Sequence, residues 1–154
     1  MYSHPDPGSF VASLDRCVVS ALSAAGHEVR HVDLHAEGFD PAFSLYERLH
    51  HTGPPEEKIE QFPYLEPHVE ALRWCEHLVL VYPTWWAAQP AMLKGWFDRV
   101  WANGVAYRLQ GDGCGPVPLL TNIRRIVAVT SNGSGKFLNA LQGESGKRLV
   151  RRSL

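Results

Sequence analysis

Apolar and polar positions along this chain follow two different periods. Continuous apolar runs at 77–82 and 125–130 are typical of strands buried on both faces. At 9–25, 68–75 and 90–101, apolar residues instead recur every three or four positions, which predicts amphipathic helices. Strands that alternate with helices are typical of a parallel sheet covered on both faces. The pattern therefore predicts a doubly wound α/β fold with three layers, α/β/α.

Local signals bound the first of these helices and the segments that follow it. Ser9 is a favourable N-cap residue, and Gly26 is a favourable residue just beyond the carboxyl end. The apolar residues expected on the buried face are Phe10, Leu14, Cys17, Val18, Ala21 and Leu22. A further strand is predicted at 28–34, where the alternation is imperfect. Between 36 and 67 the chain is rich in Pro, Gly, Glu and His, which predicts a long excursion over the surface.

The segment from Tyr82 to Tyr107 carries the most specific pattern in the chain. It reads YPTWWAAQPAMLKGWFDRVWANGVAY, so a buried strand runs into a Pro-Thr-Trp-Trp turn and Pro90 then opens a helix. This segment resembles the flavodoxin-like NAD(P)H:quinone oxidoreductases, whose members carry Pro-x-x-Trp, then Pro-Ala-x-Leu-Lys-Gly-Trp-Phe-Asp/Glu-Arg-Val, and then Phe-Ala-Tyr. The matching residues here are Pro83, Trp86, Pro90, Ala91, Leu93, Lys94, Gly95, Trp96, Phe97, Asp98, Arg99, Val100, Ala106 and Tyr107.

The resemblance implies one flavodoxin-like domain over residues 1–154, with the strand order 2-1-3-4-5. Two parts of such a domain are missing from the sequence. The first strand is reduced to Met1-Tyr2, and the chain stops at Leu154 inside the expected last crossover helix, so the last strand is absent. We therefore expect an incomplete domain that lacks most of the first strand and the last strand. An inactive truncated fragment is one alternative to an active enzyme.

Three loops follow strands of the predicted sheet and should lie along its carboxyl edge, where open α/β sheets bind ligands. These loops are 3–9, 83–89 and 130–135. The resemblance implies that they bind a flavin, either FAD or FMN. The implied cofactor-binding residues are His4, Ser9, Phe10, Pro83, Thr84, Trp85, Trp86, Ala87, Thr130, Ser131, Asn132 and Gly133.

The first loop ends at a helix N-terminus, where free N–H groups and the positive end of the helix dipole favour a phosphate. The resemblance implies that His4, the Ser9 hydroxyl and the main-chain N–H groups of Ser9 and Phe10 contact the flavin phosphate. Val11 stands where the family usually has Asn, so one side-chain contact is expected to be lost.

The other two loops are expected to hold the flavin ring. The resemblance implies that residues 84–87 pack along the isoalloxazine and that N–H groups of residues 131–133 lie near its pyrimidine side, where negative charge develops on reduction. Trp86 and Tyr107 are the expected walls of an acceptor pocket.

The implied reaction passes hydride from NAD(P)H through flavin N5 to a quinone or similar two-electron acceptor. One shared site for both substrates predicts ping-pong kinetics. Asn139 and Ser145 stand where the best-known members place a Tyr and a His that relay charge, so no catalytic acid or base is assigned.

Composition argues against several other functions. The 15 basic and 16 acidic side chains give no general attraction to nucleic acid. No apolar run approaches the length of a membrane span and the first residues lack a signal-peptide pattern, so membrane insertion is not expected and a cytoplasmic location is predicted. The three scattered cysteines fit a reducing compartment.

Two motif-based alternatives fail on their spacing. The run Gly133-Ser134-Gly135-Lys136 resembles a phosphate-binding P-loop, but Thr130 stands in place of the first Gly and Phe137 in place of Ser or Thr. Among the eight histidines, His27, His31 and His35 are spaced for a helix but lie in a segment predicted as strand and turn, so no metal site is predicted. The resemblance also implies a homodimer, and it leaves open a non-enzymatic regulatory subunit of an ion-efflux system.

Overall fold

The computed structural model describes residues 1–110 and 115–141, which form two compact units. The first unit comprises Met1–Phe39, Leu78–Leu93 and the described part of Ile126–Leu154, and the second comprises Asp40–His77 and Lys94–Arg125. The helices are α1 (Phe10–Ala24), α2 (Leu45–His50), α3 (Pro55–Gln61), the 3-10 helix η1 (Pro63–Leu65), α4 (Glu66–Trp74), α5 (Ala91–Val100) and α6 (Lys136–Leu141). The strands are β1 (His77–Pro83), β2 (Tyr107–Arg108), β3 (Val117–Pro118) and β4 (Arg125–Ser131).

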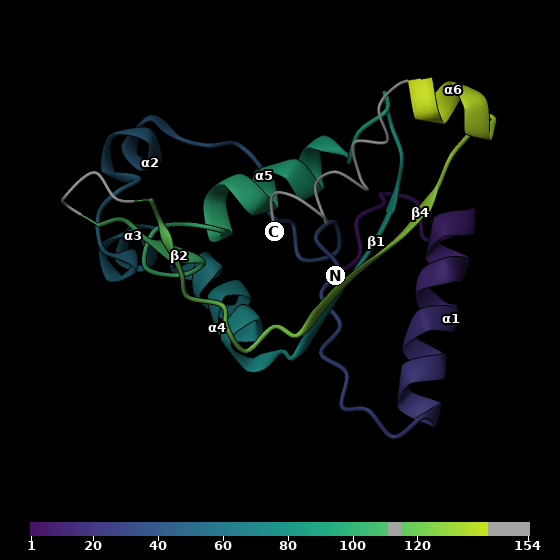
Figure 1. Cartoon of the computed structure of the whole chain (residues 1–154), viewed down its shortest axis with the longest axis horizontal. Helices are drawn as coiled ribbons and strands as arrows, with labels where there is room; N and C mark the ends of the chain where they lie inside the picture. Colours follow the sequence, from purple (N-terminus) through teal and green to yellow (C-terminus); the bar gives the residue numbers. More distant parts are fainter. Residues whose placement is uncertain (111–114, 142–154) are drawn as a thin grey trace. The chain divides into compact units, whose positions relative to one another are not determined.

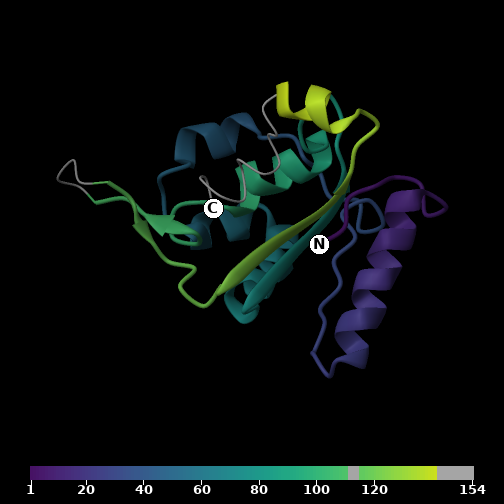
Figure 2. The same cartoon turned by 45° about the vertical axis from the view of Figure 1, so that its right-hand side comes forward.

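Strands β1 and β4 pair with each other and lie side by side in both views (Figures 1 and 2). They are parallel, because matching hydrogen bonds occur at both ends. The Arg124 N–H donates to the Glu76 carbonyl at 2.7 Å, and the Thr84 N–H donates to the Ser131 carbonyl at 2.8 Å. The two strands predicted from apolar runs and the flavodoxin-like α/β fold class are confirmed.

Residues Met1–Ser3 occupy the place of a further parallel strand beside β1. Tyr2 forms a parallel bridge with Val81 on one side and with Asp33 on the other. The Ser3 N–H donates to the Val81 carbonyl at 3.0 Å. The segment around Asp33, the Tyr2 segment and β1 therefore follow one another in the 2-1-3 order expected for this fold.

The strand predicted at 28–34 is largely wrong. Only Asp33 forms a bridge in this segment. The Tyr2 N–H donates to the Val32 carbonyl at 2.8 Å, and the Leu34 N–H donates to the Tyr2 carbonyl at 3.2 Å. Because only the short Tyr2 segment lies alongside, the earlier residues of 28–34 have no strand opposite them and stay irregular.

Helix α1 begins where the sequence predicts and lies alongside the strands of the first unit (Figure 2). The Ser9 Oγ accepts a hydrogen bond from the Ala12 N–H at 3.1 Å, the usual geometry of an N-cap. Val11 and Ala12 pack with Tyr2 and Val81 in one apolar cluster. Burial of this face holds the helix against the Tyr2 segment and β1.

The predicted buried face of α1 is wrong in part. Phe10 is 68% exposed, and Cys17 and Ala21 are exposed as well, whereas Asp15 is buried. The His31 Nε2 lies 2.8 Å from the Asp15 Oδ2. This polar contact provides a partner for the buried carboxylate, so the helix can turn its Asp15 side inward instead of its Phe10 side.

The segment 36–67, predicted to be a surface excursion, instead contains α2, α3 and η1. Ser44 and Glu47 form a capping box at the start of α2. The Ser44 N–H donates to the Glu47 Oε2 at 2.9 Å, and the Glu47 N–H donates to the Ser44 Oγ at 3.2 Å. Glu47 and Leu65 are almost completely buried, so part of this segment belongs to the interior of the second unit.

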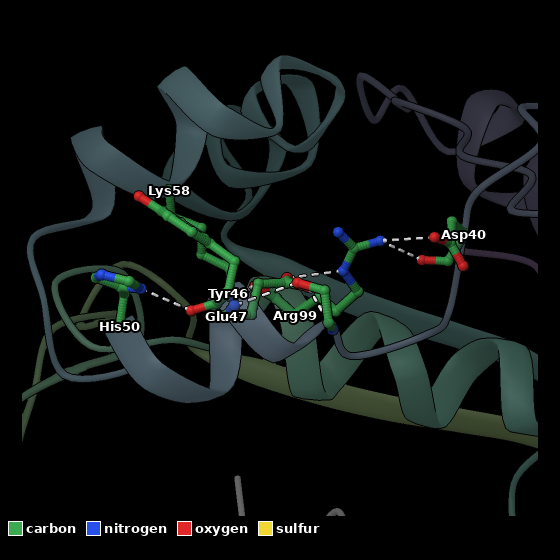
Figure 3. A network of polar contacts seen from close by, with 7 residues as sticks. Asp40, Tyr46, Glu47, His50, Lys58 and Arg99 are labelled. Carbon is green, nitrogen blue, oxygen red and sulfur yellow. Dashed lines mark hydrogen bonds and ion pairs between the residues drawn. The ribbon is translucent and has the colours of Figure 1, made fainter.

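A buried ion pair joins α2 to α5 inside the second unit (Figure 3). The Arg99 Nε donates to the Glu47 Oε1 at 2.8 Å, and the two side chains are 1% and 0% exposed. The Arg99 Nη1 also donates to the Asp40 carbonyl at 2.6 Å. The Lys58 Nζ lies 3.6 Å from the same Glu47 oxygen. Because the guanidinium and the carboxylate have several partners each, their charges are well compensated despite burial.

Aromatic side chains of the second unit pack against this network and along α5. Phe62 and Tyr64 lie 5.0 and 5.1 Å from the Arg99 Cζ, within the range of cation–π contacts. On α5 itself, the Trp96 and Phe97 rings meet edge to face at 5.1 Å and both are buried. These two helix aromatics are therefore core residues. In the described part of the chain, no helix has the length and apolar character needed to cross a membrane.

Gly95 is required by close packing within the second unit. A Cβ at this position would lie 2.2 Å from the Pro41 carbonyl oxygen and 2.5 Å from the Pro41 Cα. Because these are backbone atoms, the clash cannot be relieved by a side-chain rotation. We expect Gly95→Ala to lower the free energy of unfolding by about 1–3 kcal/mol, measured by urea denaturation. Gly115→Ala, where an added Cβ meets nothing within 4 Å, is the control and should have little effect.

Candidate functional site

The three loops that follow the strands meet at one edge of the first unit. The rings of His4, from the first loop, and Trp85, from the second, make an edge contact with centroids 5.7 Å apart. The His4 Nδ1 accepts a hydrogen bond from the Asp6 N–H at 3.0 Å. The same Nδ1 lies 3.2 Å from the Asp6 carbonyl oxygen, so the ring is held against the backbone of the first loop.

The second and third loops are joined by two threonines. The Thr84 and Thr130 Oγ1 atoms lie 2.8 Å apart and share a hydrogen bond. Next to them, the Thr84 N–H donates a hydrogen bond to the Ser131 carbonyl. The predicted convergence of the three loops is thus confirmed, and the threonine pair is a contact that the sequence alone did not indicate.

Residues Trp85–Ala88 form a tight turn just after Pro83, the buried last residue of β1. The Trp85 N–H donates to the Ala88 carbonyl at 2.9 Å, and the Ala88 N–H donates to the Trp85 carbonyl at 3.0 Å. Trp86 and Ala87 between them have φ values of 50° and 59°, which corresponds to a type I′ turn. Gly, Asn and Asp are the usual residues at these positions. The turn is therefore strained, a feature that is often found at binding sites.

The same turn presents indole rings to the solvent. Trp86 is 101% exposed and Trp85 is 44% exposed. Neither tryptophan is therefore a core residue. A flat aromatic surface at the carboxyl edge of a parallel sheet is suited to stacking with a planar ligand.

The strain at Ala87 leads to a stability prediction. A residue with a Cβ in the left-handed region costs about 1–2 kcal/mol, while the added freedom of Gly in the unfolded chain costs about 0.4–1 kcal/mol. We expect Ala87→Gly to stabilise the protein by about 0.5–1 kcal/mol, measured by thermal denaturation. Ala88→Gly is the matched control: its φ is not positive, so it should destabilise instead. A destabilised Ala87→Gly variant would argue against the positive φ.

The first loop turns tightly into the start of α1. The Gly8 N–H donates to the Asp6 Oδ1 at 2.8 Å, and the Ser9 N–H donates to the Asp6 carbonyl at 3.2 Å. The expectation that the Ser9 main-chain N–H is available to a ligand is therefore wrong. In contrast, the N–H groups of Phe10 and Val11 have no hydrogen-bond partner among the described residues. These two groups are the donors that the helix offers.

A residue that sequence reasoning did not select also contacts this loop. The Arg16 Nη1 donates to the Pro7 carbonyl at 3.1 Å, and its Nη2 donates to the Ser13 Oγ at 3.0 Å. The position of Arg16, seven residues after the N-cap Ser9, was a weak signal in the sequence. Helical side chains point toward the N-terminus, so an Arg two turns inside a helix can reach back to the preceding loop.

The third loop continues directly from β4. Thr130 and Ser131 are the last residues of the strand, and Asn132 and Gly133 follow in an exposed bend. Gly133 does not adopt a positive φ, so the bend itself does not require a glycine there. The loop lies close enough to the second loop for their direct hydrogen bonds, and its outer residues are accessible to a ligand.

Buried phenols lie beside these loops but are not suited to proton transfer. Burial raises the pKa of Tyr2, and burial also raises the pKa of Tyr82. Both side chains therefore stay neutral at pH 7 and cannot act as bases.

Some predicted residues fall elsewhere in the chain. Tyr107, the second expected wall of the acceptor pocket, is half-buried in β2 and belongs to the second unit. Asn139 lies within α6, and Ser145 is outside the described residues.

Parallel strands, a helix packed against them and ligand-accessible loops at their carboxyl edge define a flavodoxin-like α/β protein. Residues 1–149 match the model of the family described as having the flavodoxin-like fold, so the chain belongs to that family. The family resemblance of the segment from Tyr82 to Tyr107 is thereby confirmed.

Individual relatives agree with this assignment. The chain is 32% identical over 161 residues to rat NAD(P)H dehydrogenase [quinone] 1, covering 94% of this chain and 56% of the rat protein. Among solved structures, it is similar to Smu.1420 from Streptococcus mutans, with a TM-score of 0.80, 30% identity and coverage of 98% and 76% of the two chains. It is also similar to the NAD(P)H:quinone oxidoreductase from Methanothermobacter marburgensis, with a TM-score of 0.75 and 29% identity. That match covers 96% of this chain and 70% of the other. The chain thus spans little more than half the length of the rat relative.

Proposed function

We propose that this protein is a flavin-dependent NAD(P)H oxidoreductase that reduces quinones or similar two-electron acceptors. The main support is the meeting of loops 3–9, 83–89 and 130–135 at one edge, with exposed indoles on the middle loop. The relatives named as NAD(P)H:quinone oxidoreductases support the donor and the acceptor class.

The residues at this edge fit a flavin. The N–H groups of Phe10 and Val11 and the positive end of α1 are suited to a phosphate. The Ser9 Oγ accepts from the Ala12 N–H, which fixes the Ser9 side chain at the start of the helix. FAD and FMN both carry the ring and the phosphate that this arrangement would hold.

Each part of the edge would have a separate task in the reaction. A bound flavin would supply the hydride chemistry between reduced nicotinamide and a second substrate, and one shared site for both predicts ping-pong kinetics. Trp85 and Trp86 would orient planar rings by stacking and keep water away from one side. The N–H groups of Asn132 and Gly133 would stabilise negative charge on the pyrimidine side. We assign no acid or base, since hydride transfer does not require one.

The visible spectrum of the purified chain tests this function. The protein is mixed with FAD or FMN, and the spectrum is recorded before and after NADPH under anaerobic conditions. We expect bound yellow flavin that bleaches with NADPH and regains its colour when a quinone is added. Soluble protein that binds neither flavin would contradict the enzyme assignment and favour a non-enzymatic regulatory subunit or an inactive fragment.

Two further parts of the proposal concern assembly and location. We propose a homodimer, which sedimentation of the flavin-bound protein would test by its mass. A cytoplasmic location remains a prediction, to be tested by cell fractionation.

A further inference from the structure

Two buried hydroxyl groups of the first unit have no hydrogen-bond partner among the described residues. They are the Ser3 Oγ and the Tyr82 Oη, and their residues are 0% and 1% exposed. A buried polar group without a partner is unfavourable, so proteins rarely retain one. Ala and Phe would have nearly the same shapes at these positions without the hydroxyl. The two hydroxyls therefore point to a bound partner.

The pairing of the strands places these hydroxyl groups in the same row of the sheet. Tyr2 and Val81 form a parallel bridge, in which the Val81 N–H donates to the Met1 carbonyl at 2.9 Å and the Ser3 N–H donates to the Val81 carbonyl at 3.0 Å. Ser3 and Tyr82 are the next residues of the two segments, so they are neighbours. Tyr2 and Val81 pack against α1. Because successive side chains of a strand point to opposite faces, Ser3 and Tyr82 both point to the other face.

The third residue of this row is Leu34, which offers no polar side-chain group. Leu34 follows Asp33, the other bridging partner of Tyr2, and it is completely buried. Ser3 is therefore a short side chain between two long ones, in a layer from which solvent is excluded. Such an arrangement favours a guest that is small, uncharged and able both to donate and to accept hydrogen bonds. Water has these properties, and a buried water usually forms roughly two to four hydrogen bonds to polar groups that otherwise lack partners.

We propose that the Ser3 and Tyr82 hydroxyls hold a buried water molecule between the Tyr2 segment and β1. Each hydroxyl can donate to the water or accept from it, because neither has another partner among the described residues. Ser3 opens the first loop, 3–9, and Tyr82 stands directly before the second loop, 83–89. The water therefore joins the bases of two loops of the candidate site, and this role does not depend on the proposed chemistry.

Conservative variants test the shared water through stability. Ser3→Ala and Tyr82→Phe each remove one hydroxyl and keep nearly the same shape. Because either change leaves the water and the other hydroxyl with fewer partners, we expect each to lower the thermal unfolding midpoint by about 2–4 °C. The double variant should lower it by less than the sum of the two single changes. Ser20→Ala, which removes an exposed hydroxyl of α1, is the control and should not lower it.

Two stability results would overturn the proposal. One is a midpoint that stays the same or rises in Tyr82→Phe, which would show that this hydroxyl has no partner, because its removal then relieves a buried polar group. The other is a loss in the double variant equal to the sum of the single losses, which would show that the two hydroxyls do not share a partner.

Magnetic relaxation dispersion of water gives an independent measurement. This method detects water molecules that stay bound for longer than the protein takes to tumble. The unmodified protein should hold one more such water than the double variant Ser3→Ala/Tyr82→Phe. Equal numbers of long-lived waters in the two proteins would contradict the buried water, whatever their stabilities.

Discussion

A Glu47→Ala variant is expected to lose about 3–5 kcal/mol of its free energy of unfolding. Glu47 is the carboxylate partner of Arg99 inside the second unit, and both side chains are almost fully buried. Removal of the carboxylate leaves a guanidinium that has lost its closest charged partner in an apolar environment. The capping box of α2 is lost as well, because the Ser44 N–H donates to the same side chain. The measurement is the midpoint and slope of urea denaturation.

Matched variants separate the charge from the packing. Glu47→Gln keeps an acceptor oxygen for Arg99 and should lose less stability than Glu47→Ala. Adding Arg99→Met to Glu47→Ala removes the guanidinium that has lost its Glu47 partner and should recover part of the loss. Glu60→Ala, which removes an exposed carboxylate of α3, is the control and should change stability by under about 0.5 kcal/mol. A comparably small effect for Glu47→Ala would show that the pair contributes little.

The same pair predicts a dependence of stability on pH. Burial opposes ionisation of Glu47, but the hydrogen bonds from Arg99 and Ser44 outweigh it and hold the pKa of Glu47 below its ordinary value of 4.5. A group whose pKa is lower in the folded state stabilises the protein above its unfolded pKa. This contribution is therefore present at neutral pH and is lost as the pH falls below about 4.5. Glu47→Gln has no carboxylate at this position, so its free energy of unfolding should lack the part of the decrease at acidic pH that comes from Glu47.

The second large effect is expected at Trp86 and concerns binding. Stacking of a heterocyclic ring on an aromatic side chain contributes about 1–3 kcal/mol by alanine substitution. We expect Trp86→Ala to weaken flavin binding roughly 5- to 150-fold, measured by fluorescence titration with FMN. Because Trp86 is fully exposed in the free protein, this truncation should leave the unfolding midpoint nearly unchanged.

Conservative and distant substitutions define what the Trp86 result means. Trp86→Phe keeps a flat ring and should retain most of the affinity. Phe137→Ala removes another exposed aromatic of the first unit, 83% accessible on α6, and should not alter flavin binding. If Trp86→Ala binds FMN as tightly as the unmodified protein, the exposed indole is not a stacking surface for the flavin.

Several features could be predicted from the sequence because their causes are local. The apolar runs of β1 and β4 identify buried strands, and Ser9 and Pro90 set the starts of two helices. Strand direction follows from the alternation with helices, so the meeting of the three loops could also be expected. The exposed Trp85-Trp86 turn was visible as a pattern, and the family assignment followed from the residues around it.

The tertiary structure alone decided which distant groups became partners. Glu47 and Arg99 are 52 positions apart, and nothing in the composition of 36–67 indicated that its helices would bury a carboxylate against α5. The side of α1 that turns inward depends on Asp15 meeting His31, and the strand predicted at 28–34 depends on how much chain lies beside it. Local periodicity and turn residues specify where elements begin and end. Packing and the pairing of charges across the fold specify which of their side chains meet, because those energies arise only once the elements are assembled.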